Sequence, residues 1–160
     1  MKQDFLPSDS LEAYRAACKD MDDVYSLCSR YCGLPDAEYW TLLMIIEGAQ
    51  SQRDISQLLH VSRQTINSAC KQLMAKGLIH LEAIEGDQRA KRIVLTDAGR
   101  QFADERIGCI HRAEERVWAA MSAEEREALV GLMRKYNGLM RAQLSALPPW
   151  MPRSHTEEPT

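Results

Sequence analysis

Polar and cationic side chains are concentrated between residues 62 and 71 of this 160-residue chain. If this segment is helical, Ile66, Ala69 and Leu73 share one face and the polar residues lie on or near the opposite one. Hydroxyl, amide and cationic groups hydrogen-bond to base edges and phosphates, and a single helix fits the major groove of DNA, which is about 12 Å wide. The candidate contact residues are Ser62, Arg63, Gln64, Thr65, Asn67, Ser68 and Lys71.

A second charged group follows in the chain and consists of Asp87, Arg89, Lys91 and Arg92. Residues 79–83 and 92–95 are predicted as short strands, and the polar residues 84–91 are predicted as their connection, with a turn at Gly86 and Asp87. A cationic hairpin tip directly after an exposed polar helix is placed to reach a neighbouring minor groove or the phosphate backbone. Together, the two elements favour a DNA-binding surface over the alternative, which is an ordinary exposed helix whose polar residues have no binding role.

The distribution of charge supports this interpretation, although the net charge of −3 is unusual for a protein that binds nucleic acid. Residues 62–92 hold six basic and three acidic side chains, whereas the first 50 residues hold four basic and nine acidic ones. The segment with the candidate contacts therefore has a charge of +3, and the rest of the chain has −6. This pattern predicts a basic face on an acidic scaffold.

Other chemistries have little support in the sequence. Cys28 and Cys32 lie one helical turn apart and could share a soft metal ion, but they belong to the same apolar stripe as Leu11 and Met21, which favours packing of free thiols. The four histidines, at positions 60, 80, 111 and 155, lack metal-ligand spacing. The sequence also lacks a glycine-rich phosphate loop, a nucleophile elbow and a marked pair of carboxylates. We therefore expect no enzymatic activity, no cofactor and no metal site.

Helices are predicted to position the two charged groups. An apolar stripe with spacings of three and four residues predicts a first helix that begins near Leu11 and ends at Gly33. Pro35 suits the first turn of a second, largely apolar helix that extends to about Glu47. Capping residues mark the starts of four later helices: Ser51, Ser62, Thr96 and Ser122. The order of four helices, a β-hairpin and two long helices is a mainly α fold with a small β-hairpin.

The hairpin and its flanks resemble a known family. Asp87-Gln88-Arg89, followed by Ile93-Val94-Leu95-Thr96 and Gly99, matches the D-x-R and L-T-x-x-G wing signature of MarR-type transcriptional regulators. Residues 61–65 and 73–78 agree with the family in the same order, so the resemblance covers about residues 11–147. It implies a winged helix-turn-helix dimer whose long N- and C-terminal helices form the dimerisation region. It also implies that Arg89 enters the minor groove while Asp87 holds the wing in shape through a local ion pair.

This resemblance divides the chain into four expected parts. They are an N-terminal dimerisation helix (1–34), a winged helix-turn-helix domain (35–100), C-terminal dimerisation helices (101–147) and a flexible tail (148–160). The apolar stripes of the long helices independently favour a homodimer, because one small winged domain cannot cover so much apolar surface. A two-fold dimer would place its recognition helices about 34 Å apart on a pseudopalindromic site.

We expect a cytoplasmic regulator that binds double-stranded DNA and no membrane, because no stretch approaches the ~20 apolar residues of a membrane span and the N-terminus does not resemble a signal peptide. The family analogy favours a repressor that small aromatic or anionic effectors release by binding between the dimerisation region and the winged domain. Tyr14, Tyr39 and Trp40 are candidate wall residues of that pocket, although core packing explains them equally well. Two alternatives stay open: a winged-helix module that binds a protein, and the same DNA-binding scaffold triggered by a thiol or a metal ion.

Overall fold

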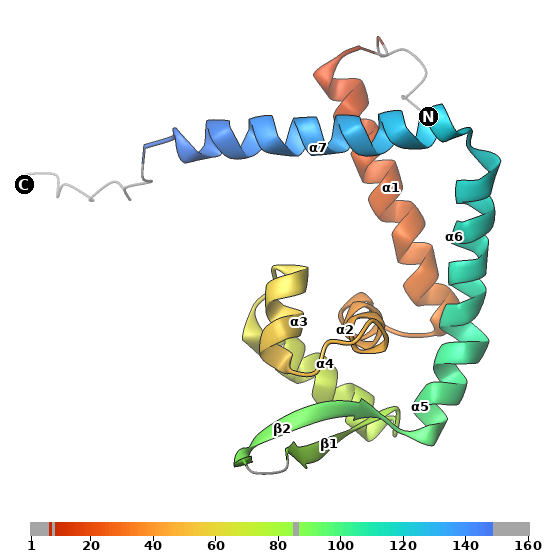
Figure 1. Ribbon diagram of the computed structural model, residues 1–160, viewed down its shortest axis with the longest axis vertical. Coiled ribbons are helices and arrows are strands. Elements are labelled where there is room, and N and C mark those ends of the chain that lie inside the picture. The colour runs from red at the N-terminus through yellow and green to blue at the C-terminus, as the bar shows by residue number, and fades with distance from the viewer. Residues whose placement is uncertain (1–6, 8, 85–86, 149–160) are drawn as a thin grey trace, which may run out of the picture. The chain divides into compact units, whose positions relative to one another are not determined.

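The computed structural model of the chain describes residue 7, residues 9–84 and residues 87–148, with the backbone alone for residue 84 and residues 87–90. The chain divides into two compact units, residues 1–114 and residues 115–160. In chain order (Figure 1), the elements are α1 (Leu11–Cys32), α2 (Asp36–Ile46), α3 (Gln52–Leu59), α4 (Arg63–Ala75), β1 (Ile79–Ile84), β2 (Asp87–Leu95), α5 (Asp97–Phe102), the π-helical turn η1 (Ala103–Ile107), α6 (Gly108–Ala120) and α7 (Ala123–Ser145).

Side-chain caps begin the helices where the sequence predicts them. In each case the side-chain hydroxyl accepts a hydrogen bond of 2.9–3.2 Å from the backbone N–H three residues later, and the capping residues are Ser51, Ser62, Thr96 and Ser122. At the start of α7 the cap is reciprocal, because Glu125 also accepts a hydrogen bond from the backbone N–H of Ser122. Gly33 ends α1 in the left-handed conformation, with a φ of 68°.

Helix α2 is the centre of the first unit. It packs against α1, α3, α4 and β2, and Figure 1 shows it nearly end-on, with α3, α4 and the hairpin around it. Tyr39, Leu42, Leu43 and Ile45 are all buried on this helix. The prediction of an apolar central helix is therefore confirmed.

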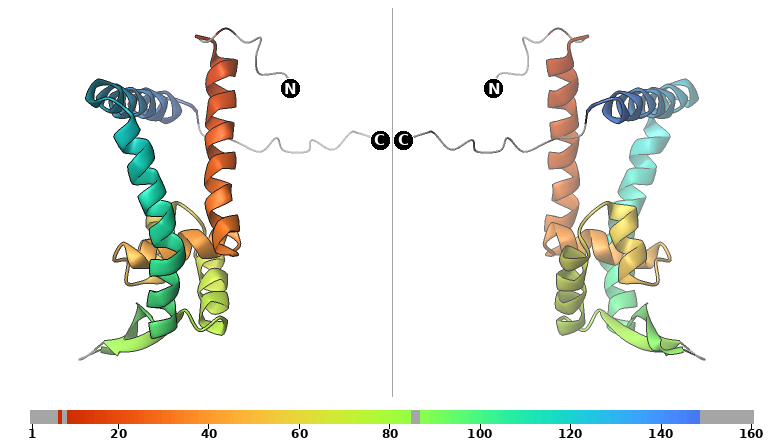
Figure 2. Two further views of the ribbon diagram at one scale, coloured as in Figure 1. Left: turned by 90° about the vertical axis from the view of Figure 1, so that its right-hand side faces the viewer. Right: turned by 90° about the vertical axis from the view of Figure 1, so that its left-hand side faces the viewer.

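Strands β1 and β2 form an antiparallel two-stranded sheet in which Glu82 lies opposite Arg92. The predicted hairpin is confirmed, but the predicted connection over residues 84–91 is wrong, because β2 already begins at Asp87. Both faces of a two-stranded sheet can be exposed to solvent. The strand residues near the turn therefore need not show the alternation of apolar and polar residues by which a half-buried strand is predicted. Figure 2 shows the hairpin at one end of the first unit.

A close backbone contact joins the hairpin to α5. Thr96 donates from its backbone N–H to the carbonyl oxygen of Leu78 (3.1 Å) and from its hydroxyl to that of Gly77 (2.5 Å). The same hydroxyl accepts from the N–H of Gly99 (2.9 Å). Gly99 is buried, and a Cβ atom at this position would lie 1.9 Å from the Leu78 oxygen. The contact therefore requires glycine, which gives a physical reason for the spacing of Thr96 and Gly99 in the wing signature.

The first of the two predicted long helices contains a feature that the sequence did not indicate. It begins as α5, passes through the π-helical turn η1 and continues as α6. Within the described ranges, no helix is long and apolar enough to span a membrane. The predicted division of the chain into four parts stays a prediction, and residues 149–160 of the predicted tail lie outside the described residues.

Candidate nucleic-acid interface

Helix α4 has one buried apolar face and one exposed polar face. Ile66, Ala69, Cys70 and Leu73 are at most 3% exposed. Of the predicted contact residues, Asn67 is half-buried, and the exposed ones are Ser62, Arg63, Gln64, Thr65, Ser68 and Lys71. The structure therefore brings these predicted residues together around one helix, as the helical period requires.

The turn between α3 and α4 fixes the start of this polar face. His60 adopts a left-handed conformation with a φ of 54°. The hydroxyl of Ser56 donates to the carbonyl oxygen of Val61 (2.7 Å). Ser62 then caps α4, and its Oγ lies 2.8 Å from Oγ1 of Thr65. The first turn of α4 contains no acidic residue, so the partial positive charge of this helix N-terminus is available to an anion such as a phosphate.

An ion pair anchors the far end of α4 to the central helix. Lys76, the C-cap residue of α4, pairs with Glu38 of α2. The Glu38 side chain is 8% exposed, and the Lys76 side chain is 40% exposed. The charge of Lys76 is therefore compensated by a buried carboxylate. Lys76 is one of the six basic residues of segment 62–92, but in the structure it stabilises the packing of α4 on α2 and does not add to the exposed positive charge.

The wing carries a second network of charged side chains. Arg92 donates to Oε2 of Glu82 from Nε (3.0 Å) and from Nη2 (2.8 Å). Nε2 of His80 lies 3.0 Å from the other carboxylate oxygen of Glu82. The hydrogen bond from Arg92, followed by that from His80, lowers the pKa of Glu82. Arg92 of β2 is thus paired with Glu82 of β1, and both Arg92 and Lys91 are exposed.

Two of the predicted wing residues fall where the structure describes the backbone alone. The side chains of Asp87 and Arg89 lie outside the described residues. Their local ion pair and the contact of Arg89 with the minor groove therefore stay predictions. Sequence reasoning missed Glu82 and His80, since their link to Arg92 depends on the strand register.

Two of the predicted aromatic residues, Tyr39 and Trp40, pack together, whereas the third, Tyr14, lies apart from them on α1. Tyr39 is 2% exposed, and its ring centroid lies 5.2 Å from that of Trp40 in an edge-to-face arrangement. Trp40 also lies 5.9 Å from Tyr25 of α1, which sequence reasoning missed. Burial raises the pKa of Tyr39 far above its ordinary value. Tyr14 is on the surface of α1, about 16 Å along the helix from Tyr25 at 1.5 Å per residue. The role of these residues as an effector pocket stays a prediction.

Three of the five cysteine side chains, those of Cys28, Cys32 and Cys70, pack in or against the core. Cys70 is completely buried, and burial raises the pKa of its thiol to about 11. Burial also raises the pKa values of Cys28 and Cys32. Thiols with raised pKa values carry little thiolate at neutral pH, which disfavours nucleophilic reactivity. In the described part of the chain, no group of three or more His, Cys, Asp or Glu side chains is arranged to hold a metal ion.

Comparison with known sequences matches the part of the chain that forms this interface. The model of the MarR family matches residues 33–90, from the end of α1 into β2. A relative, the HTH-type transcriptional repressor NicR of Pseudomonas putida, is 31% identical over 88 residues. These residues are 55% of this chain and 56% of NicR. The alignment therefore spans little more than half the length of that relative.

Comparison with solved structures extends the similarity to most of the chain. The structure of a MarR family regulator from Neisseria meningitidis matches with a TM-score of 0.71 and 20% identity, covering 84% of this chain and 96% of that one. The S. aureus MepR–DNA complex matches with a TM-score of 0.67 and 18% identity, covering 84% of this chain and 99% of MepR. At these identities the similarity establishes the fold, which is a winged helix-turn-helix with long terminal helices.

Proposed function

We propose that this chain, which belongs to the MarR family of winged helix-turn-helix proteins, binds a specific double-stranded DNA sequence as a homodimer and regulates transcription. The exposed polar face of α4 carries this proposal, because it gathers hydroxyl, amide and guanidinium groups beside a helix N-terminus that lacks acidic residues. Such groups read base edges in the major groove and bind phosphates.

The residues of α4 and the wing have different proposed roles. Gln64, in the first turn of α4, and Ser68, near its middle, are exposed and contact base edges. Arg63 and Lys71 bind phosphates on either side of them. In the wing, Arg89 enters the minor groove, and Lys91 and Arg92 contact the backbone. Asp87 supports Arg89, while Ser62, Thr65 and Asn67 complete the surface of α4. The S. aureus protein MepR, which shares this fold, forms a complex with DNA.

Exposed apolar side chains support the proposed homodimer. On α1, Val24 and Leu27 are 53% and 55% exposed. On α7, Leu132 and Leu139 are 66% and 59% exposed. Large exposed apolar side chains along one helix indicate an interaction site, and helices with apolar stripes associate with other helices. A second copy of the chain supplies both stripes and a second recognition helix, which suits a pseudopalindromic operator.

We also propose that the dimer represses transcription by blocking access to a promoter and that a small aromatic or anionic effector releases it. NicR is named as a transcriptional repressor, and steric blocking requires no further partner. The effector would act by preferring a dimer in which the spacing of the recognition helices does not match the operator. Tyr14, Tyr39 and Trp40 are the proposed wall residues, with Tyr25 added because its ring packs on Trp40.

The experiment compares DNA binding by two lysine variants over a range of salt concentrations. DNA sites are first selected from random duplexes, and binding is then measured by fluorescence anisotropy. Lys71→Ala should weaken binding and reduce the slope of log affinity against log salt by about 0.9, which corresponds to one lost phosphate contact. Lys19→Ala is the matched control, because Lys19 is also an exposed helical lysine but lies on the acidic α1.

Base contacts and the wing are tested in the same assay. Gln64→Ala should change the preferred sequence at one position by about 1–3 kcal/mol. Arg89→Ala should weaken binding more than Lys19→Ala at every salt concentration. If Lys71→Ala and Arg89→Ala both bind selected DNA as the wild type does, α4 and the wing are not the DNA-binding surface. If the wild type selects no DNA from random duplexes, the DNA-binding proposal is wrong and the module that binds a protein replaces it. A stable monomer at micromolar concentration in size-exclusion chromatography would contradict the homodimer.

A further inference from the structure

Three side chains that carry or can gain a charge gather on one face of the wing. Residues two apart along a strand share a face of the sheet, as do residues paired across two strands. His80 and Glu82 of β1 therefore share a face with Arg92 of β2, which lies opposite Glu82. Lys91 precedes Arg92 in the strand and lies on the other face. The three side chains are between 37% and 51% exposed, and we refer to His80, Glu82 and Arg92 as the wing triad.

The carboxylate of Glu82 is the centre of the wing triad. Its Oε2 accepts hydrogen bonds from Nε and Nη2 of Arg92 (3.0 and 2.8 Å), whereas its Oε1 lies 3.0 Å from Nε2 of His80. Arg92, followed by His80, lowers the pKa of Glu82, so the carboxylate keeps its charge at neutral pH. While the imidazole of His80 is neutral, the charges of Glu82 and Arg92 cancel. Protonation of His80 gives the wing triad a net charge of one positive unit.

The elements packed against β1 leave His80 with Glu82 as its charged neighbour. Strand β1 packs against β2 and α4. The residue opposite His80 on β2 is Val94, which is apolar. At the end of α4, the charge of Lys76 is already compensated by Glu38. The charge of His80 is therefore felt mainly by the carboxylate of Glu82.

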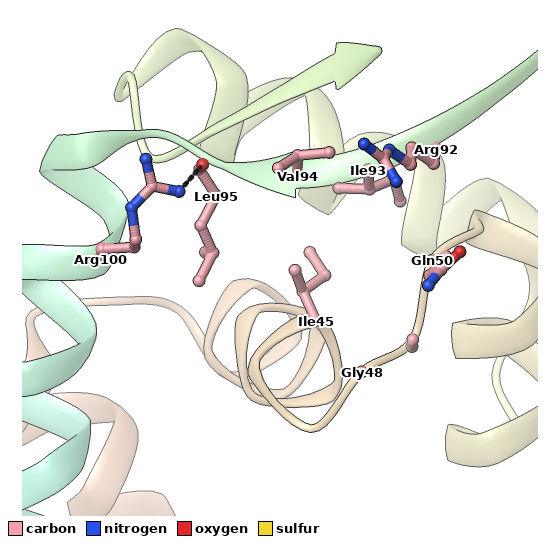
Figure 3. A pocket seen from close by; sticks show the side chains of 9 residues that line it. Ile45, Gly48, Gln50, Arg92, Ile93, Val94, Leu95 and Arg100 are labelled. Atoms are coloured by element: carbon pink, nitrogen blue, oxygen red, sulfur yellow. Dashed lines mark hydrogen bonds between the residues drawn. The ribbon is translucent and has the colours of Figure 1, made fainter. Parts of the chain in front are cut away.

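The elements packed against β2 bring a second cation toward Arg92 but no second carboxylate. Arg92 and Arg100 of α5 both line a cavity of about 340 Å³, which Figure 3 shows between β2, α5 and the end of α2. Arg100 is held by a hydrogen bond from its Nη1 to the carbonyl oxygen of Leu95 (2.7 Å), drawn as a dashed line in Figure 3, and it pairs with Asp97. In the described part of the chain, no acidic side chain lines this cavity. The carboxylate that Arg92 meets is therefore that of Glu82.

We propose that Glu82 competes with DNA phosphates for Arg92 and that protonation of His80 favours the DNA, an inference that rests on the proposed contact of Arg92 with the DNA backbone. Phosphate and carboxylate oxygens accept hydrogen bonds from the same guanidinium donors. When Arg92 turns to a phosphate beside a neutral His80, Glu82 is left without a cation. An imidazolium at Oε1 supplies that cation. Glu82 and His80 are thus positioning residues that act on DNA through Arg92.

The direction of the pH dependence follows from the charges. Histidine is the side chain that ordinarily changes its charge between pH 5 and 8. A bound phosphate stabilises the protonated wing triad, so DNA binding takes up a proton and the affinity rises as the pH falls from 8 to 6. Because interactions between exposed charges are weak, we expect a gain of about threefold. The slope of log affinity against log salt should become steeper by up to about 0.9, since Arg92 adds one phosphate contact.

The experiment measures binding of a DNA duplex, selected from random sequences, to the full chain by fluorescence anisotropy at pH 6 and pH 8. The wild type should bind about threefold more tightly at pH 6. His80→Gln cannot gain the proton and should lose this difference. His111→Gln is the matched control, because His111 lies on α6 outside the wing, and it should keep the difference. His60, in the turn before α4, contributes equally to the wild type and to His80→Gln, so comparison of these two proteins isolates His80.

Glu82→Gln separates competition from structural support. Glutamine has the size of glutamate but no charge, so this variant should bind DNA about threefold more tightly than the wild type at pH 8 and lose the pH dependence. A residue that only supported the wing would weaken binding when replaced. Glu115→Gln is the matched control for the loss of one negative charge, because Glu115 is an exposed glutamate on α6. Arg92→Gln should also remove the pH dependence, since the other two residues act through Arg92.

Three results would overturn this inference. They are equal wild-type affinity at pH 6 and pH 8, an equal gain at pH 6 in the wild type and in His80→Gln, and weaker binding by Glu82→Gln than by Glu115→Gln at pH 8. Each of them requires that the wild type binds the selected DNA, so the proposed function would stand. A wild type that selects no DNA would instead contradict the proposed function, and this inference with it.

Discussion

Replacing Gly99 by alanine should destabilise the protein through the contact that joins the hairpin to α5. The added Cβ would lie 1.9 Å from the carbonyl oxygen of Leu78, whereas real Cβ atoms essentially never approach closer than 3.0 Å. The backbone of α5 or of Leu78 must therefore move by more than an ångström. That movement disturbs the hydrogen bonds of Thr96 to Leu78 and to Gly77.

The size of this effect follows from the contacts that are lost. Two hydrogen bonds are worth about 1 kcal/mol each, and overpacking next to a rigid backbone costs about 1–3 kcal/mol. We expect Gly99→Ala to lower the free energy of unfolding by about 3–5 kcal/mol, and the thermal midpoint by roughly 10 °C. Urea unfolding followed by tryptophan fluorescence, at one fixed protein concentration, measures the change as a lower midpoint at an unchanged slope.

Gly108→Ala is the matched control for this prediction. The new Cβ would lie 3.2 Å from Nη1 of Arg112, which is the flexible end of a side chain, so a small shift relieves the contact. Alanine also has a higher helix propensity than glycine by about 1 kcal/mol. Gly108→Ala should therefore be neutral or slightly stabilising. If Gly99→Ala costs no more than Gly108→Ala, the steric explanation of the wing signature is wrong.

Three further changes test other parts of the fold. Ser51→Ala should cost about 1 kcal/mol in urea unfolding because it removes the cap on the N–H of Asp54, and Ser51→Asp should retain most of that stability. Lys76→Met leaves Glu38 buried without its cation and should cost about 1–3 kcal/mol, whereas Lys76→Arg should cost less; equal losses would contradict the ion pair. Burial raises the thiol pKa of Cys70 from 9.0 to about 11, so the neutral thiol contributes its stability fully below pH 9 and loses it as the pH rises through 11. Relative to Cys70→Ala, the wild type should therefore lose about 2 kcal/mol over this window, and parallel pH profiles would refute the assignment.

The starts and faces of the helices were predictable from the sequence because they depend on residues close together in the chain. Ser62 caps the backbone three residues later, and the polar face of α4 follows from its 3.6-residue period. The wing was less predictable. Residues 87–91 are mostly polar and show no strand pattern. This part of β2 depends on pairing with β1, in which Lys91 lies opposite Ala83 and Asp87 opposite Ile84, with a register shift between them. The prediction from local pattern therefore failed where pairing with another segment decided the structure.

The sequence by itself determined the order of the elements, the polar face of α4 and the resemblance of the wing to that of MarR-type regulators, because capping, periodicity and short motifs are local properties. The tertiary structure decided which cations remain available. Lys76 is 38 residues from Glu38, and Arg92 is 10 residues from Glu82, yet each lysine or arginine meets its carboxylate in the fold. It also decided the cavity at Arg100 and the need for glycine at position 99. These features depend on the distance between segments, which neither composition nor spacing along the chain contains.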